Sequence, residues 1–326
     1  MLEHGGRLKA AARRYGIAEA DWLDLSTGIA PWPFPLPALD IRDWTRLPET
    51  DDGLEAAARA YYGTEHLLPV PGSQAAIQSL PHLRPAGRVG VLSPCYAEHA
   101  EAWCRAGHTL VELDEEQVER ALERLDVLVL VNPNNPTGRL LEPGLLLDWR
   151  ERLARRGGWL VVDEAFIDCT PEHSLAASAG EGLIVLRSFG KFFGLAGARL
   201  GFVLADAGLL ATLAERLGPW AISGPARAVG RHCLRQHGEQ LRQRECAMAA
   251  SRRLAELLDG HGWTPHGGCA LFRWRADPRA GELHEFLARR GILVRLFERP
   301  ASLRFGLPGR EADWQRLEQA LEAFET

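Results

Sequence analysis

The chain has 326 residues, of which 46% are hydrophobic and 25% charged, and a formal net charge of −5 at pH 7. It is long enough for about two domains, and it has no apolar run near the roughly 20 residues that a membrane helix requires. The first residues lack the cationic and apolar segments of a secretory signal, and the negative net charge argues against nucleic-acid binding. The six cysteines are scattered without a CxxC pair, so we expect reduced thiols in a cytoplasm.

The first two thirds of the chain predict an α/β domain. Residues 31–37 contain four prolines, which excludes a helix or an interior strand and predicts an extended connector. From residue 72 to 205, short apolar segments alternate with helix-compatible ones. The predicted strands are 89–92, 109–113, 127–131, 159–162, 183–186 and 200–204, and the predicted helices are 97–107, 115–125 and 143–156. Several strands are continuous apolar runs, which is typical of a mostly parallel sheet that binds ligands at the carboxyl ends of its strands.

The last third of the chain predicts a smaller α+β domain. It begins with a helical region rich in arginine and alanine at residues 225–258. Strands are expected at 269–274 and 292–296, and helices at 282–290 and 311–324. We therefore expect a large α/β domain at residues 45–224. Residues 1–44 and 225–326 are expected to form the small domain with its N-terminal arm.

One of only two lysines lies in a glycine-rich motif. The chain has Lys9, Lys191 and 36 arginines, and Lys191 follows a predicted strand that ends near Ser188. Arg199 comes eight residues after this lysine, and the residues around it are mostly apolar. An amine in apolar surroundings loses its proton more easily, as a Schiff-base lysine requires, whereas a guanidinium stays protonated. The alternative is a surface loop with an incidental lysine.

Three further motifs follow or precede predicted elements. Residues 131–138, Val-Asn-Pro-Asn-Asn-Pro-Thr-Gly, come directly after a strand, although such a sequence also forms ordinary tight turns. Asp163 ends an apolar strand, where a carboxylate needs a partner. Taken alone it could be a helix N-cap or a metal ligand, but no cluster of His or Cys supports a metal site. Residues 72–74, Gly-Ser-Gln, open a helix and suit a phosphate, although any helix N-terminus looks similar.

Together these motifs resemble the pyridoxal-phosphate (PLP) enzymes of the aspartate aminotransferase fold, type I, over nearly the whole chain. The resemblance implies that Lys191 binds the cofactor covalently and later transfers protons. It implies that Asp163 pairs with the pyridine nitrogen, and that Asn135 donates a hydrogen bond to the phenolic oxygen of the ring. The residues that resemble the phosphate-binding cup are Gly72, Ser73, Gln74, Ser188 and Arg199.

The resemblance extends to two more residues and shows three departures. Tyr96 resembles the catalytic-site aromatic residue that stacks on the cofactor ring, although it could also be a core tyrosine. Arg304 resembles the arginine that grips the substrate α-carboxylate with two hydrogen bonds. Phe166 stands where many relatives have Tyr, and Gly190 stands where Ser is common. Leu47 occupies the place where relatives present a tyrosine to the partner subunit's cofactor.

Within this fold, segments 4–6, 24–31 and 163–168 resemble the threonine-phosphate decarboxylase branch of cobalamin biosynthesis, which is itself similar to histidinol-phosphate aminotransferase. The substrates of both enzymes are phosphorylated amines. The substrate-binding residues that the resemblance implies are His4, Gly5, Gly6, Thr27, Gly28, Asn135 and Arg304. A flexible terminus is the alternative for the N-terminal segment.

The resemblance implies a cytoplasmic homodimer that uses PLP to decarboxylate L-threonine O-3-phosphate, with no nucleic-acid or membrane partner. The product is (R)-1-aminopropan-2-ol O-2-phosphate. Because the same core residues serve transamination, histidinol-phosphate aminotransferase stays as an alternative. A cofactor-binding protein without turnover is a second alternative. The ligands of the substrate phosphate beyond His4 stay open among Arg7, Arg273 and Arg295.

Overall fold

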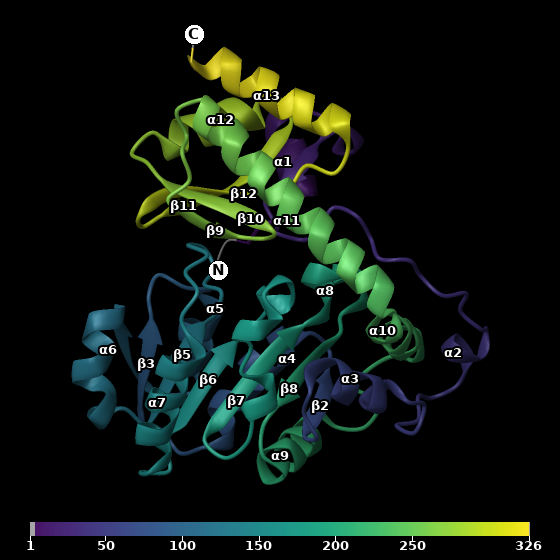
Figure 1. The fold of residues 1–326 in the computed structure, drawn as a ribbon, viewed down its shortest axis with the longest axis vertical. Coiled ribbons are helices and arrows are strands. Elements are labelled where there is room, and N and C mark those ends of the chain that lie inside the picture. Colours follow the sequence, from purple (N-terminus) through teal and green to yellow (C-terminus); the bar gives the residue numbers. More distant parts are fainter. Residues whose placement is uncertain (1–3, 326) are drawn as a thin grey trace. The chain divides into compact units, whose positions relative to one another are not determined.

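The computed structural model describes residues 4–325, which form two compact units (Figure 1). The larger unit comprises residues 33–135 and 140–241. The smaller unit comprises the residues up to 32, the short segment 136–139 and the residues from 242 onward. The chain therefore leaves the larger unit directly after Asn135 and re-enters it at Leu140.

The larger unit is built around a seven-stranded sheet with the order β2-β8-β7-β6-β5-β3-β4. Its strands are β2 Leu67–Val70, β3 Arg88–Leu92, β4 Thr109–Leu113, β5 Val127–Val131, β6 Trp159–Asp163, β7 Leu183–Ser188 and β8 Gly201–Leu204. Its α-helices are α2 Arg42–Thr45, α3 Leu54–Tyr62, α4 Ser73–Ser79, α5 Glu98–Arg105, α6 Glu115–Ala121, α7 Pro143–Ala154, α8 Phe189–Phe192, α9 Ala207–Leu217 and α10 Gly224–Arg235. The pairs β3–β4, β3–β5, β5–β6 and β6–β7 are parallel, which confirms the predicted α/β class. The sequence did not predict β2, and β8 pairs antiparallel with both β2 and β7.

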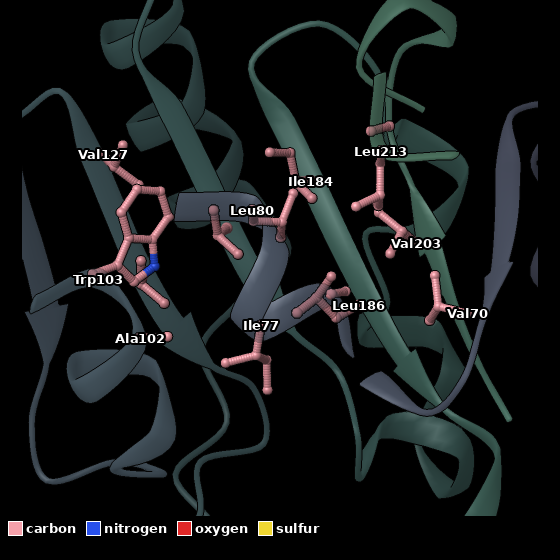
Figure 2. Close-up of a cluster of buried hydrophobic side chains, with 14 of the residues drawn as sticks. Val70, Ile77, Leu80, Ala102, Trp103, Val127, Ile184, Leu186, Val203 and Leu213 are labelled. Carbon is pink, nitrogen blue, oxygen red and sulfur yellow. The ribbon is translucent and has the colours of Figure 1, made fainter. Parts of the chain in front are cut away.

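Both faces of this sheet are covered. In β5, no residue is more than 3% exposed, although its side chains point alternately to the two faces. Figure 2 shows the core on one face, where side chains of α4 and α5 pack on the strands. Its labelled members are Val70, Ile77, Leu80, Ala102, Trp103, Val127, Ile184, Leu186, Val203 and Leu213. Because the central strands are buried on both faces, a polar residue such as Asp163 lies at the end of its strand.

The larger unit extends beyond the predicted boundaries at 44/45 and 224/225. At its amino end, the N–H of Phe34 donates to the carbonyl of Phe193 at 2.9 Å. At its carboxyl end, α10 packs on α3, where Arg227 pairs with Asp52 and with Glu55, each at 2.7 Å. These contacts place the 33–44 segment and α10 in the larger unit.

The smaller unit has a five-stranded sheet with the order β1-β11-β12-β10-β9. Its strands are β1 Leu23–Leu25, β9 Gly267–Cys269, β10 Phe272–Ala276, β11 Ile292–Glu298 and β12 Ala301–Gly306. Its helices are α1 Leu8–Tyr15, α12 Ala280–Ala288, α13 Glu311–Glu325 and the part of α11 His237–Gly260 from residue 242 on. The predicted strand 269–274 is a hairpin of two strands, and the predicted helix 225–258 is two helices that break at Gln236. Among residues 4–325, no helix is long and apolar enough to cross a membrane.

Candidate active site

The predicted cofactor residues follow neighbouring strands of the larger sheet. Asp163 ends β6 and Ser188 ends β7, while Asn135 and Tyr96 come four residues after β5 and β3. These four strands are parallel neighbours, so their carboxyl ends meet at one edge of the sheet. The antiparallel strand β8 begins at the same edge, where Gly201 pairs with Ser188. Gly201 also pairs with the last residue of β2, which brings the turn at residues 72–74 to this edge.

Glycines bring an arginine close to this turn. Gly72 has a φ of +76°, and a Cβ atom on it would lie 2.6 Å from a guanidinium nitrogen of Arg199. A Cβ atom on Gly201 would lie 2.6 Å from the backbone nitrogen of Ser73. Side chains at either glycine would therefore collide with the groups beside them. A guanidinium and the first backbone N–H groups of α4 lie together here, which suits a phosphate group.

Asp163 is buried and has two hydrogen-bond partners. Its Oδ2 lies 3.0 Å from Nε2 of His99, and its Oδ1 accepts a hydrogen bond from the N–H of Ala165 at 3.0 Å. The ring of His99 also packs edge-on against Tyr96, with 6.1 Å between centroids. His99 was not predicted from the sequence. The available signal was its position three residues after Tyr96, at the start of the predicted helix 97–107.

Tyr96 is held by a side-chain network. Its hydroxyl group donates to Oε1 of Gln74 at 3.1 Å, and Nε2 of Gln74 donates to Glu98 at 2.7 Å. Burial, with smaller effects of Glu98 and Asp163, raises the pKa of Tyr96 to about 12. The phenol is therefore protonated at neutral pH. The amide of Gln74, which the sequence placed in the phosphate cup, is bound to these two protein partners.

Lys191 lies in α8, among aromatic side chains. Its Nζ atom is 5.7 Å from the centre of the ring of Phe166. Phe189 and Phe192, on either side of it in the sequence, are buried. A Cβ atom on Gly190 would lie 2.6 Å from the Cα of Ala196, so this segment has no room for a side chain there. This contact gives a physical reason for glycine at this position.

A buried ion cluster joins the ends of β6 and β7 next to the predicted cofactor residues. Arg187, which precedes Ser188, pairs with Glu164 at 3.0 Å and with Asp168 at 2.6 Å. Its guanidinium also lies 4.6 Å from the centre of the Tyr62 ring. The three charged side chains are almost completely buried, and Tyr61 donates a further hydrogen bond to Asp168 at 3.0 Å. The cluster therefore holds the ends of β6 and β7 together, next to the predicted cofactor residues.

The loop that carries Asn135 is tied to its surroundings by its other asparagines. The side chain of Asn132 exchanges hydrogen bonds with the backbone of Leu141 at 2.8 and 3.2 Å. Asn134 donates to the carbonyl of Pro94 at 2.8 Å, which connects this loop with the segment that leads to Tyr96. Asn135 itself is half-buried.

The predicted carboxylate-binding residue lies in the smaller unit. Arg304, on β12, is buried and donates to the carbonyl of Ser26 at 2.8 Å, and its guanidinium lies 5.0 Å from the centre of the Phe272 ring. Burial lowers the pKa of Arg304 to about 10, which leaves it charged at neutral pH. In the sheet register it pairs with Arg295 on one side and Trp274 on the other, so all three side chains share one face.

The predicted N-terminal substrate residues gather around the same turn of the smaller unit. The N–H of Gly6 donates to the hydroxyl group of Ser26 at 2.7 Å. A Cβ atom on Gly5 would collide with the carbonyl oxygen of Ser26, and one on Gly6 would lie 3.2 Å from the side chain of Thr27. Gly28 has a φ of +63°. The chain at 4–6 therefore packs on the turn at 26–28, which also contacts Arg304.

One group of side chains in the described part of the chain has the spacing of metal ligands. It consists of His261, Glu318 and Glu322, whose ligand atoms lie within 4.8 Å of one another. Both glutamates are exposed, and exposed acidic groups are common without a metal ion. The sequence predicted no metal site, and none of these three residues was a candidate from the sequence.

A family model of the class I and II aminotransferases matches residues 21–324, so the chain belongs to this family. It is 66% identical over 325 residues to the threonine-phosphate decarboxylase of Pseudomonas aeruginosa, covering 99% of this chain and 98% of that one. It is 46% identical over 334 residues to the threonine-phosphate decarboxylase of Sinorhizobium sp, again covering 99% and 98%. The family resemblance expected from the motifs is confirmed.

A solved structure confirms the fold. The histidinol-phosphate aminotransferase of Sinorhizobium meliloti, in complex with pyridoxal-5'-phosphate, superposes with a TM-score of 0.87. The superposition covers 99% of this chain and 96% of that one, at 17% identity. At that identity the likeness concerns the fold, so the sequence relatives carry the argument about function.

Proposed function

We propose that this protein is a PLP-dependent decarboxylase that converts L-threonine O-3-phosphate to (R)-1-aminopropan-2-ol O-2-phosphate for cobalamin biosynthesis. The observation that carries the proposal is the 66% identity with a threonine-phosphate decarboxylase over almost the whole of both chains. The histidinol-phosphate aminotransferase of Cronobacter sakazakii is 31% identical over 272 residues, which cover 78% of this chain. The core residues serve both reactions, so full-length identity is what favours decarboxylation.

The residues at the edge of the larger sheet fit PLP chemically. An aldehyde needs an amine, which Lys191 offers, and a pyridine nitrogen needs a buried acid, which Asp163 offers. A phosphate needs cationic and N–H donors, which Arg199 and the turn at 72–73 offer beside one another. Ser188, paired in register with Gly201, would add a hydroxyl group to the phosphate site. When bound, PLP accepts the electrons of the bond that breaks at the substrate Cα.

The side chains divide the work of the reaction. In this proposal Lys191 would bind the cofactor aldehyde and afterwards move protons with its Nζ atom, which lies 5.7 Å from the centre of the Phe166 ring. Asp163 would keep a proton on the pyridine nitrogen, and His99 keeps the Asp163 carboxylate oriented. Tyr96 would stack on the cofactor ring, and Asn135 would donate to its phenolic oxygen.

The substrate is held by residues of the smaller unit. Arg304 would bind the α-carboxylate, because a guanidinium matches a carboxylate with two parallel hydrogen bonds. The orientation of the α-carboxylate would decide the reaction, since the bond that breaks at Cα is the one held perpendicular to the cofactor ring. We assign the phosphate to His4 and to the backbone at Gly5, Gly6 and the 27–28 turn. Of the three arginines left open by the sequence, Arg295 is favoured because it is paired with Arg304 on the same face.

We also propose that the protein is a cytoplasmic homodimer. The segment at 36–47 carries four large apolar side chains that are between 61% and 71% exposed: Leu36, Ile41, Trp44 and Leu47. Part of this segment lines a cleft of about 740 Å³ with α10. Exposed apolar residues gathered in this way favour a protein interface. Light scattering should therefore give twice the chain mass, and Trp44→Glu should reduce it, whereas Leu145→Glu on α7 should not.

The proposed reaction is tested by supplying the PLP-loaded protein with L-threonine O-3-phosphate and no 2-oxo acid. A decarboxylase releases CO2 and aminopropanol phosphate over many turnovers. An aminotransferase stops without an amino acceptor and instead converts histidinol phosphate once 2-oxoglutarate is added. A cofactor-binding protein without turnover consumes neither substrate.

A further inference from the structure

Glu98, which is not among the predicted cofactor residues, belongs to the hydrogen-bond network around Tyr96. Glu98 Oε2, at the start of α5, accepts hydrogen bonds from Nε2 of Gln74 at 2.7 Å and from Nε2 of Gln78 at 3.0 Å. The two glutamines are one turn apart on α4, so they lie on the same face of that helix. Gln74 alone continues the network, since its Oε1 accepts the hydrogen bond from the hydroxyl group of Tyr96 at 3.1 Å. Gln78 instead accepts a hydrogen bond from Arg105.

The carboxylate of Glu98 determines which groups of this network donate hydrogen bonds and which accept them. A side-chain amide has a donor end and an acceptor end of nearly equal shape, and either end could face a hydroxyl group. An ionised carboxylate only accepts hydrogen bonds, so Glu98 requires the NH2 end of Gln74. The oxygen end of Gln74 must then face Tyr96. A hydroxyl group beside an acceptor donates its proton to it, which fixes the rotation of the Tyr96 O–H bond.

We propose that Glu98 is a positioning residue for Tyr96, acting through the amide of Gln74. Through Gln74, Glu98 keeps the phenol proton of Tyr96 in a hydrogen bond within the protein. The phenol oxygen then offers only acceptor lone pairs to a bound group. A ligand that presents an N–H or O–H donor to Tyr96 is accepted, and one that presents an acceptor is disfavoured. This inference rests on the proposed function only in placing Tyr96 beside the cofactor.

The test follows Tyr96 directly. The chain has four tyrosines, so 3-fluorotyrosine labelling gives a simple fluorine NMR spectrum in which Tyr96→Phe identifies one resonance. In the PLP-loaded protein, Glu98→Gln should shift or broaden the Tyr96 resonance, because the new amide lets Gln74 turn either end toward the phenol. An unchanged resonance would overturn the proposal.

Gln78→Ala is the matched control. It removes a hydrogen bond to the same carboxylate and lies on the same helix as Gln74, but its amide oxygen accepts from Arg105 and not from the hydroxyl group of Tyr96. Its Tyr96 resonance should stay at the wild-type position even if its melting temperature falls. A shift as large as that of Glu98→Gln would mean that Glu98 only fastens α4 to α5.

A double variant tests the relay. In a Gln74→Ala background the link is already broken, so adding Glu98→Gln should produce no further change in the Tyr96 resonance. A further change would show that Glu98 reaches Tyr96 by another route and would contradict the proposal. If Glu98→Gln does not fold, Glu98→Ala against Gln78→Ala makes the same comparison, because it also removes the acceptor that fixes the amide of Gln74. These spectra are independent of turnover, so a wild-type protein without decarboxylase activity would refute the proposed function and leave this test intact.

Discussion

Nε2 of His99 lies 3.0 Å from Oδ2 of Asp163, and both side chains are buried. A buried carboxylate that loses a hydrogen-bond partner destabilises the fold by about 1–3 kcal/mol. We therefore expect His99→Leu to lower the free energy of unfolding by that amount and to weaken PLP retention. His99→Gln keeps a donor and should recover part of both. Urea unfolding and dialysis of bound PLP measure the two effects, and wild-type values in the Leu variant would contradict this role.

Lys191→Ala should abolish turnover, because no arginine can replace a neutral amine. Because the chain has two lysines, the site of covalent labelling gives a simple independent readout. Reduction of the PLP-loaded protein with borohydride should fix a pyridoxyl group on the peptide that contains Lys191. Lys9, the other lysine, is exposed on α1 and serves as the internal control. Label on Lys9 alone, or activity retained in Lys191→Ala, would refute the assignment.

Gly190→Ser should be unfavourable. The new Cβ atom would lie 2.6 Å from the Cα of Ala196, so the backbone of the 189–199 segment must shift. Overpacking of this kind costs about 1–3 kcal/mol. We expect a lower melting temperature and faster loss of PLP, because Lys191 and Arg199 lie in the displaced segment. Gly197→Ser, where a Cβ atom meets nothing within 4 Å, is the matched control and should change neither quantity.

Arg187→Gln should be among the most destabilising single substitutions in the larger unit. It leaves Glu164 and Asp168 buried without their cation, and breaking a buried ion pair costs about 3–5 kcal/mol. Arg152→Gln is the control, because Arg152 also pairs with several carboxylates but lies at the surface, where such pairs contribute about 0–1 kcal/mol. Equal losses in the two variants, measured by urea unfolding, would show that the buried cluster has no special structural weight.

Strands with a clear local pattern were predictable, both in the interior of the larger sheet and at its edge strand β4, whereas β1, β2 and the interior strand β12 of the smaller sheet were missed. The strands at 109–113 and 127–131 were predicted to the residue, because their apolar or alternating sequences end sharply at polar residues or turns. The edge strands β2 and β1 were missed, since β2 contains a proline and β1 has only three residues. Such short segments become strands only through their neighbours, and no local pattern marks them.

The residues to which we assign a covalent or ionic role stand out in the sequence, whereas the residues that support them do not. Lys191 and Asp163 stand out because a lone lysine and an acid at the end of an apolar strand are unusual in their surroundings. His99 and Glu98 occupy ordinary helical positions, and their importance comes from what they contact in three dimensions. The same holds for Arg187, which reads as one arginine among 36 in the sequence.

The most direct test of the central claim follows the carboxyl carbon of the substrate. The PLP-loaded protein is given L-threonine O-3-phosphate labelled with ¹³C at C1, in D2O, without a 2-oxo acid, and the products are observed by NMR. We predict ¹³C-labelled bicarbonate and an unlabelled aminopropanol phosphate that carries one deuterium at the carbon bonded to nitrogen. Substrate that keeps its ¹³C label, or a labelled 2-oxo acid that appears only when an amino acceptor is added, would contradict the account.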